Sequence, residues 1–138
     1  MTQPFSMTFT AQPEHIDVMG HVNNAVWLKW MEELAGAHWS AQAAPEHVDA
    51  YIWFVTRHEI DYRGNVTEGA MVTATTFIPT PPRGARFDRH VVFHDAEGKE
   101  LVRAKSTWAM IERETGRIAR VPKDMAERFV MPEGSERP

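Results

Sequence analysis

The sequence predicts an α+β fold in which one long helix is wrapped by a single curved antiparallel sheet. Apolar residues recur at helical spacing from about Asn23 to Ala43. Residues 4–11, before this segment, alternate apolar and polar side chains, and a period of two returns after Pro45 for most of the remaining chain. One strand, one helix and then a run of strands give the helix a single sheet to pack against.

The first strand and the helix have clear signals. In residues 4–11, Phe5, Met7 and Phe9 lie on one side of an extended chain, as expected for a half-buried strand. A loop follows over residues 12–21. Asn23 or Asn24 is a plausible N-cap, because an Asn side chain accepts a hydrogen bond from a free amide of the first turn. The predicted buried helical face consists of Trp27, Trp30, Met31, Leu34 and Ala37.

The rest of the chain is predicted to be mainly sheet. Turn residues at 63–65, prolines at 79–82 and the segment 95–98 separate the successive strands. Pro122 suits the first position of a short terminal helix that ends near Phe129, and the tail from Met131 is expected to fray. The expected strands are 51–63, with Ile52, Phe54, Ile60 and Tyr62 on one face, then 71–78, 86–94, 101–113 and 117–121.

Length, composition and charge fit one globular domain over residues 1–138. A chain of 138 residues buries a sizeable core without needing to split it. Its 43% hydrophobic and 25% charged residues argue against disorder. The formal net charge of -4 provides no overall basic field, so we expect no nucleic-acid partner.

The sequence also limits the chemistry and the compartment. It has no cysteine, which excludes disulfides, thiolate nucleophiles and cysteine-based zinc sites and fits a reducing compartment, the cytoplasm. Residues 1–10 show neither a basic segment nor a long apolar run, so we expect no signal peptide and no membrane anchor. His90 and His94 would lie roughly 13 Å apart along a strand, too far for one metal ion. We therefore expect no metal and no redox cofactor.

The densest polar cluster spans residues 15–27 and leads directly into the long helix. A helix start offers unpaired amides and a partial positive charge, which can polarise an acyl carbonyl and stabilise an oxyanion. Asp17, a few residues upstream, can attack that carbonyl or activate a water molecule. The alternative is purely structural: Asp17 caps a turn and Asn23 caps the helix.

These residues resemble the hotdog-fold thioesterases of the 4-hydroxybenzoyl-CoA thioesterase type. Further similarity covers nearly the whole chain, at segments 54–62, 104–111 and 120–122. The plant acyl-carrier-protein thioesterases share part of the motif but have a polar Asn where this sequence has Met19. The matching positions, in order, are Asp17, the run Gly20-His21-Val22-Asn23-Asn24, Trp27 and Glu33.

The resemblance implies a hotdog fold and hydrolysis of an acyl-CoA thioester to a free acid and CoA. Asp17 would act as nucleophile or general base, and the helix-start amides would polarise the carbonyl. An apolar acyl pocket is expected between the long helix and the strand that contains Phe54. Glu33 is left out of the catalytic set because Lys29, one turn earlier, is an equally good surface partner. The predicted site consists of the catalytic Asp17 and His21 and the substrate-binding Gly20, Asn24, Trp27 and Phe54.

Two other functions stay open at this stage. A hotdog domain can bind an acyl thioester without hydrolysing it, and a carrier-protein thioesterase would use the same chemistry. A hydratase would need a longer motif, which is not visible in the sequence. A sheet wrapped on one helix leaves a strand edge open, and pairing two such edges predicts a homodimer or a tetramer of dimers.

Overall fold

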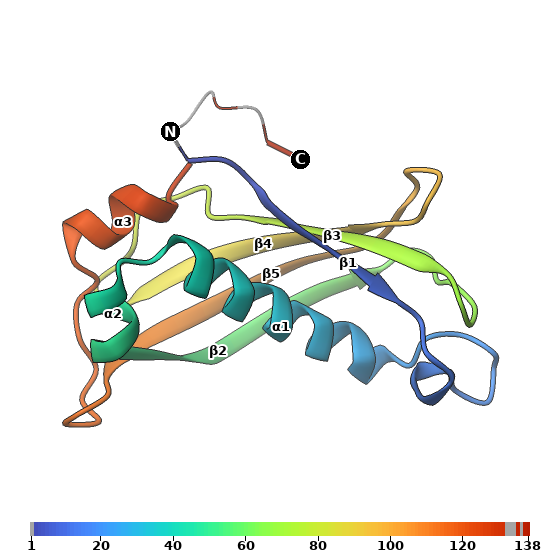
Figure 1. Cartoon of the computed structure of the whole chain (residues 1–138), viewed down its shortest axis with the longest axis horizontal. Helices are drawn as coiled ribbons and strands as arrows, with labels where there is room; N and C mark the ends of the chain where they lie inside the picture. Colours follow the sequence, from blue (N-terminus) through green and yellow to red (C-terminus); the bar gives the residue numbers. More distant parts are fainter. Residues whose placement is uncertain (1, 132–134, 136) are drawn as a thin grey trace.

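The structure is a computed structural model that describes residues 2–131, 135 and 137–138. The strands form one antiparallel sheet in the order β1-β3-β4-β5-β2, and the long helix α1 lies across one face of it (Figure 1). This confirms the predicted α+β architecture. The strands are β1 (Phe5–Thr10), β2 (Tyr51–Tyr62), β3 (Met71–Phe77), β4 (Arg86–His94) and β5 (Glu100–Glu112); the helices are the short 3-10 turn η1 (Pro13–His15), α1 (Asn24–Gln42), α2 (Pro45–Ala50) and α3 (Lys123–Phe129).

Helix α1 begins at Asn24, directly after its N-cap residue. The Asn23 side chain accepts a hydrogen bond from the Ala25 amide at 2.9 Å, so Asn23 is the N-cap. At the other end Ala43 and Ala44 are extended, and Pro45 cannot continue the hydrogen-bond ladder. The buried face of α1 consists of Trp27, Trp30, Met31, Leu34, Ala35 and His38.

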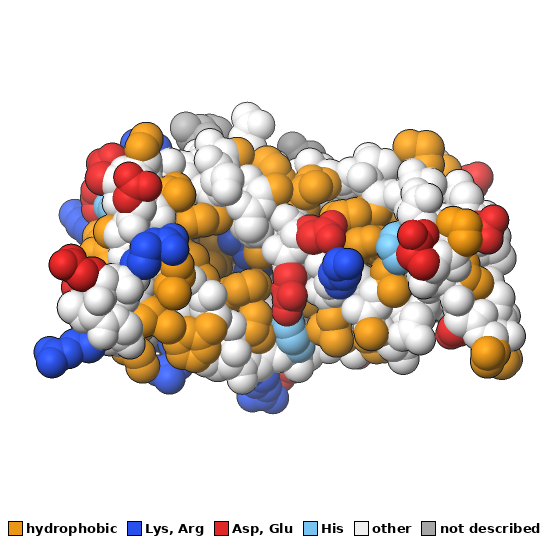
Figure 2. All heavy atoms as spheres, turned by 60° about the horizontal axis from the view of Figure 1, so that its bottom comes forward, with side chains coloured by type: hydrophobic (Ala, Val, Ile, Leu, Met, Phe, Trp, Pro, Cys, Tyr) orange, Lys and Arg blue, Asp and Glu red, His pale blue; other side chains and the backbone are white. Residues whose placement is uncertain are grey.

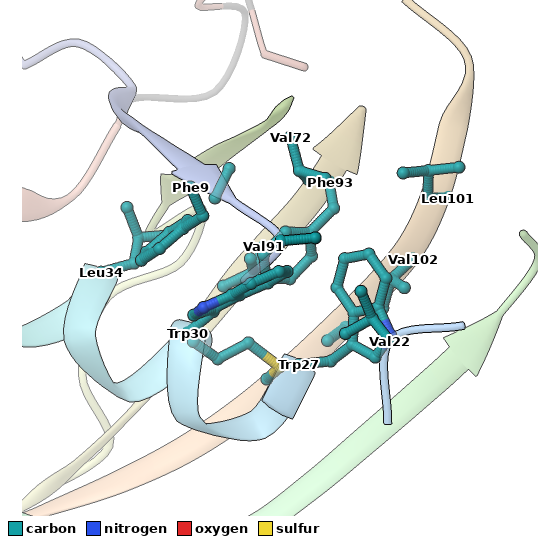
Figure 3. Packing of buried hydrophobic residues seen from close by; sticks show 14 residues of the cluster. Phe9, Val22, Trp27, Trp30, Leu34, Val72, Val91, Phe93, Leu101 and Val102 are labelled. Carbon is teal, nitrogen blue, oxygen red and sulfur yellow. The ribbon is translucent and has the colours of Figure 1, made fainter. Parts of the chain in front are cut away.

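The larger core cluster fills the space between α1 and the sheet (Figure 3). The Trp27 and Trp30 rings meet edge to face at 5.2 Å, and Phe93 of β4 closes on Trp27 at 5.0 Å. Phe9 of β1 stacks on Trp30 at 5.2 Å. Edge-to-face and stacked aromatic pairs of this kind add about 0.5–1.5 kcal/mol each beyond area burial. These contacts fix α1 against the strands and thereby position the loop that precedes it.

Two sequence predictions for the middle of the chain were wrong. Residues 45–50, expected to enter the sheet, form helix α2, whose first position is Pro45. A proline fits there because its fixed φ suits a first helical turn and its missing amide has no partner to lose. The period-two signal of the neighbouring strand masked this single helical turn.

The predicted apolar face of β2 was also wrong, because of a β-bulge. The register with β5 shifts between Val55 and Arg57, which leaves Thr56 as an extra residue. Ile60 is half-buried, whereas Ile52 and Phe54 alternate outward and are exposed. An extra residue changes which side chains face the core, so simple alternation fails across it.

The C-terminal part is less regular than predicted. Residues 117–121 make only an isolated bridge between Ile111 and Ile118. Pro122 is the N-cap of α3 rather than its first residue. Met131 is buried and donates its amide to Ile78 O at 2.9 Å, while the rest of the predicted frayed tail lies largely outside the described residues.

Candidate active site

The loop before α1 is a tight turn built around the Asp17 side chain. Asp17 Oδ1 accepts hydrogen bonds from the Met19 amide at 2.9 Å and from the His21 amide at 3.3 Å. The main chain closes the same turn, since the Asp17 amide donates to His21 O at 2.8 Å. Gly20 has φ of 80°, a left-handed conformation that favours glycine. The turn geometry therefore accounts for Asp17 and Gly20, whereas His21 takes part in it only through its main chain.

The Asp17 carboxylate keeps one oxygen free of these contacts. Both side-chain hydrogen bonds that Asp17 makes within the described residues end on Oδ1. The carboxylate is half-buried, and the turn holds it in one orientation. Asp17 therefore does cap the turn, and it does so with only one of its two carboxylate oxygens. Oδ2 remains available to attack an acyl carbon or to accept a proton from water.

Polar contacts attach this turn to the rest of the fold. Asn65, from the β2–β3 connection, accepts from the Val22 amide at 3.0 Å and donates to Val22 O at 3.1 Å. The Asn23 amide donates to His15 O at 2.9 Å, which links the helix cap to η1. Tyr62 of β2 donates its hydroxyl to Asn24 O at 3.3 Å. The loop and the helix start are thus positioned by η1, by the end of β2 and by the segment that follows it.

The structure brings four of the six predicted site residues together in this loop and places two elsewhere. Asp17, Gly20, His21 and Asn24 lie on the turn or the first residue of α1, where His21 and Asn24 are exposed. Trp27 is 0% exposed and belongs to the core. Phe54 is 37% exposed, on the outward side of β2. Neither Trp27 nor Phe54 lines the large cavity described next.

A cavity of about 380 Å³ lies near the far end of α1. It is enclosed by the C-terminal half of α1, by α2 and α3 and by the inner face of the sheet. Figure 2 shows this end as a hollow walled by hydrophobic side chains. Its volume is in the range of small-ligand pockets. The aromatic residues of its wall are Trp39, Tyr51, Trp53, Phe87, Trp108 and Phe129.

One wall of this apolar cavity carries a buried cation, Arg89 of β4. The residue is 3% exposed, and its Nη1 donates to His38 Nδ1 at 2.8 Å and to Thr76 Oγ1 at 3.0 Å. Burial lowers the pKa of Arg89 to about 9, so it stays charged at neutral pH. Burial and the Arg89 charge lower the pKa of His38 to about 3, which keeps that imidazole neutral. The sequence predicted neither residue, because the strand pattern does not show which cation faces inward.

A histidine–serine pair lies on the inner side of β2 and β5. His58 Nδ1 and Ser106 Oγ are 2.6 Å apart. Burial lowers the pKa of His58, and the charge of Glu32 on α1 opposes that shift. Ser106 is 2% exposed, so its hydroxyl cannot reach an acyl group in this state. The pair therefore acts as a buried cross-strand contact rather than as a nucleophile with its base.

The described residues contain no group of three or more His, Cys, Asp or Glu side chains that could hold a metal ion. Nor does the described part of the chain include a helix that is long and apolar enough to cross a membrane.

Comparison with known families assigns the chain. Residues 11–129 match the family model described as the thioesterase-like superfamily. The chain belongs to this superfamily. Its fold is the hotdog fold, which confirms the structural expectation drawn from the Asp17 to Asn24 motif.

Solved structures of other proteins share this architecture. The 1,4-dihydroxy-2-naphthoyl-CoA thioesterase Slr0204 from Synechocystis superposes with a TM-score of 0.74 at 18% identity, over 88% of this chain and 91% of that one. SAV2348 from Staphylococcus aureus, solved in complex with CoA, gives a TM-score of 0.79 at 18% identity over 100% and 96% of the two chains. At these identities the similarity establishes the fold alone.

A curated relative is the chloroplastic acyl-[acyl-carrier-protein] hydrolase FATB3 of Cuphea viscosissima. It is 27% identical over 79 residues, which cover 57% of this chain and 19% of that protein. The matched segment thus spans about a fifth of the relative's length. The family match assigns the superfamily, and it names neither the carrier nor the acyl group of the substrate.

Proposed function

We propose that the protein hydrolyses acyl-CoA thioesters to a free acid and CoA, with Asp17 as its catalytic carboxylate. The observation that carries this proposal is the Asp17 turn, a few residues before the α1 N-cap: Oδ1 is fixed by two amides, whereas Oδ2 has no hydrogen bond to any of the described residues. Membership of the thioesterase-like superfamily supports the reaction class. The proposed reaction uses no metal or redox cofactor, because hydrolysis changes no oxidation state and Asp17 itself activates the water or attacks the acyl carbon.

The chemistry has two routes that share one geometry. As general base, Asp17 takes a proton from water while the water oxygen attacks the acyl carbon; the C–S bond then breaks and CoA leaves as the thiol after accepting a proton. As nucleophile, Asp17 attacks the acyl carbon and the C–S bond breaks, so that CoA leaves as the thiol after accepting a proton; water then hydrolyses the resulting mixed anhydride to the free acid and restores the Asp17 carboxylate. In both routes the carbonyl oxygen gains negative charge near the amides and the positive end of the α1 dipole.

The other residues of the turn hold or flank the substrate in this scheme. Gly20 gives the chain its left-handed bend without a side chain, so that a thioester can approach the backbone. His21 is exposed beside Asp17 and can orient the carboxylate or contact the thioester. Asn24, the first residue of α1, is exposed at the point where the oxyanion would lie.

We favour CoA as the carrier, because the motif from Asp17 to Asn24 resembles that of the 4-hydroxybenzoyl-CoA thioesterase type. A structural neighbour was solved with CoA, whereas the curated relative acts on an acyl carrier protein. Met19 stands where the plant enzymes have a polar residue and is 76% exposed at the tip of the turn. The cavity at the far end of α1 is the acyl site that we propose, in place of one lined by Trp27.

We further propose that the protein is a cytoplasmic homodimer or a tetramer of dimers. Strand β2 is an edge of the sheet and pairs only with β5 among the described strands. It exposes Ile52, Phe54 and Tyr62, an apolar row that a second copy would cover. Pairing of subunits would matter for catalysis. Asp17 and the cavity lie toward opposite ends of α1 within one subunit, and a second subunit can join these two parts. Glu32, the cavity residue nearest the helix start, lies about 12 Å along the axis from Asn24.

A hydrolysis screen tests the reaction class. Acyl-CoAs of varied length and polarity, together with acyl carrier protein substrates, are mixed with the protein, and free-thiol release is followed. Release from CoA substrates is the expected result. Release only from carrier-protein substrates would reassign the carrier, and binding without any release would identify a non-hydrolytic acyl-thioester-binding module.

A further inference from the structure

Arg89 is an unusual group for the wall of an acyl cavity. It is a cation that is 3% exposed, and the described residues place no carboxylate within ion-pair distance of it. Burying a charge costs several kcal/mol, roughly, unless a counter-charge or a full set of hydrogen bonds compensates it. His38 and Thr76 provide only neutral acceptors. The fold therefore bears a cost here that a bound anion would remove.

The arrangement of its donors shows where such an anion would bind. Both hydrogen bonds that Arg89 makes within the described residues start at Nη1. Nε is buried and has no hydrogen-bond partner in the part of the chain that the structure describes. Nε and Nη2 together form the side-on pair of donors that binds a carboxylate through two parallel hydrogen bonds. His38 and Thr76 thus hold the guanidinium by one nitrogen and leave this pair of donors unused.

A second unused donor lies on the same wall. Trp108 of β5 lines the cavity, and its indole Nε1 is buried with no hydrogen-bond partner among residues 2–131, 135 and 137–138. Buried polar atoms in native proteins are paired in the great majority of cases, so two such donors at one cavity need an explanation. Both lack an acceptor, and the wall around them is aromatic. A ligand that fits would have an apolar body and an acceptor-bearing, anionic end.

We propose that this cavity binds an acyl group that ends in a carboxylate, which Arg89 recognises through Nε and Nη2. The proposal rests on the thioesterase function above and deepens it, because it names the substrate class: apolar acyl thioesters with a carboxylate at the end distant from the thioester. The aromatic wall encloses the body of the acyl group, and the thioester remains outside the cavity.

The test uses ligand pairs that differ only in this end group. Binding of 4-methylbenzoate and of neutral 4-methylbenzamide is measured by calorimetry, which requires no turnover. Hydrolysis of adipoyl-CoA and hexanoyl-CoA is compared as kcat/KM. We expect the carboxylate to bind more tightly by about 10- to 100-fold, the range of a charged hydrogen-bond pair, and adipoyl-CoA to be preferred to a similar extent. Equal values within both pairs in the wild type would overturn the proposal.

Two variants locate the recognition. Arg89→Met replaces the guanidinium with an apolar side chain of similar length. We expect this variant to lose the carboxylate preference while binding the amide as before. Arg113→Met is the matched control: this arginine also lines the cavity, but it is exposed and already donates to the Val48 and Asp49 carbonyls. Preference kept in Arg89→Met, or lost in Arg113→Met, would overturn the assignment to Arg89.

The binding arm separates failure of this inference from failure of the proposed function. Carboxylate binding that depends on Arg89 supports the inference even if no thioester is hydrolysed. Hydrolysis with no carboxylate preference keeps the function and rejects the inference. Arg89→Lys keeps the charge but not the pair of donors; if Arg89→Met fails to fold, a lysine variant with the wild-type preference would contradict recognition by Nε and Nη2.

Discussion

At the scale of single residues, Asp17 has a structural role in the turn and, in our proposal, a chemical role as well. Its Oδ1 closes the turn, and the proposal assigns the chemistry to Oδ2. A carboxylate that only capped the turn could be replaced by an amide, since an Asn oxygen accepts the same amides. The two roles are therefore separable by substitution, even though they share one side chain.

His38 gives the molecule a predictable response to acid. Its folded pKa of about 3 lies below the ordinary 6.5, because burial and the Arg89 charge disfavour the protonated ring. As pH falls below 6.5 the unfolded chain takes up this proton and the folded protein does not. Stability is therefore lost from about pH 6.5 downward, at up to about 1.4 kcal/mol per pH unit, and is unaffected by His38 above that window.

The check is thermal melting of the wild type and His38→Gln between pH 7 and pH 4.5. Gln can still accept a hydrogen bond from Arg89 but does not titrate. We expect the variant to lose less stability over this interval than the wild type. Identical pH profiles for the two proteins would show that His38 is not the responsible group.

Sequence patterns predicted single residues unevenly. The helix start was predicted from its capping residues, whereas the motif residues from Asp17 to Asn24 were singled out by their resemblance to a thioesterase family. Arg89 and His38 were missed, because an arginine on a strand gives no signal that it points inward without a counter-ion. Trp27 was assigned to the substrate, whereas its ring packs in the core among Trp30 and Phe93.

At the scale of elements, the limits of α1 and of most strands follow from caps, prolines and turn residues. The errors occur where tertiary context overrides the local period. Helix α2 at residues 45–50 interrupts the period of two that the sequence suggested after Pro45, and the bulge at Thr56 breaks the alternation within residues 51–63. Before the bulge, Trp53 lines the cavity and Phe54 is exposed, whereas beyond it Ile60 is half-buried, so the side of the strand that faces inward changes across the bulge.

The packing of β2 against α1 predicts how acyl preference can be changed. Trp53 lines the cavity and meets Trp39 edge to face at 5.6 Å. Trp53→Leu should enlarge the cavity, so that the relative kcat/KM for longer acyl-CoAs rises. The control is Trp27→Leu, which should lower stability by about 2–5 kcal/mol, as large-to-small core changes do, and leave the preference unchanged. Unchanged preference in a folded Trp53→Leu would place the acyl group elsewhere.

At the scale of the whole molecule, the two parts of the site lie apart along α1. The turn with Asp17 precedes the helix, and the cavity begins at Glu32 and continues to its C-terminal end. A long acyl group along α1, or a second subunit, can join the two parts. The sequence predicted the open sheet edge but not this separation, because the separation depends on where α2 and α3 pack.

The free edge of β2 predicts assembly through that strand. Phe54→Lys adds a charge to the exposed apolar row and should convert the oligomer to a monomer, because a charged edge resists strand pairing. Thr8→Lys, an exposed position on the opposite edge strand β1, is the matched control and should leave assembly intact. Sedimentation velocity at micromolar concentration measures both. A monomeric wild type, or dissociation by Thr8→Lys alone, would contradict assembly through β2.

The most direct measurement for the account as a whole is thiol release by Asp17→Asn on the best acyl-CoA substrate, together with its melting curve. The amide keeps an oxygen for the Met19 and His21 amides, so the turn and the melting temperature should be preserved. It cannot attack the thioester well or accept a proton from water, so kcat should fall by about 100-fold or more. Near-normal turnover in a folded Asp17→Asn would contradict a catalytic Asp17 and leave it the turn cap alone.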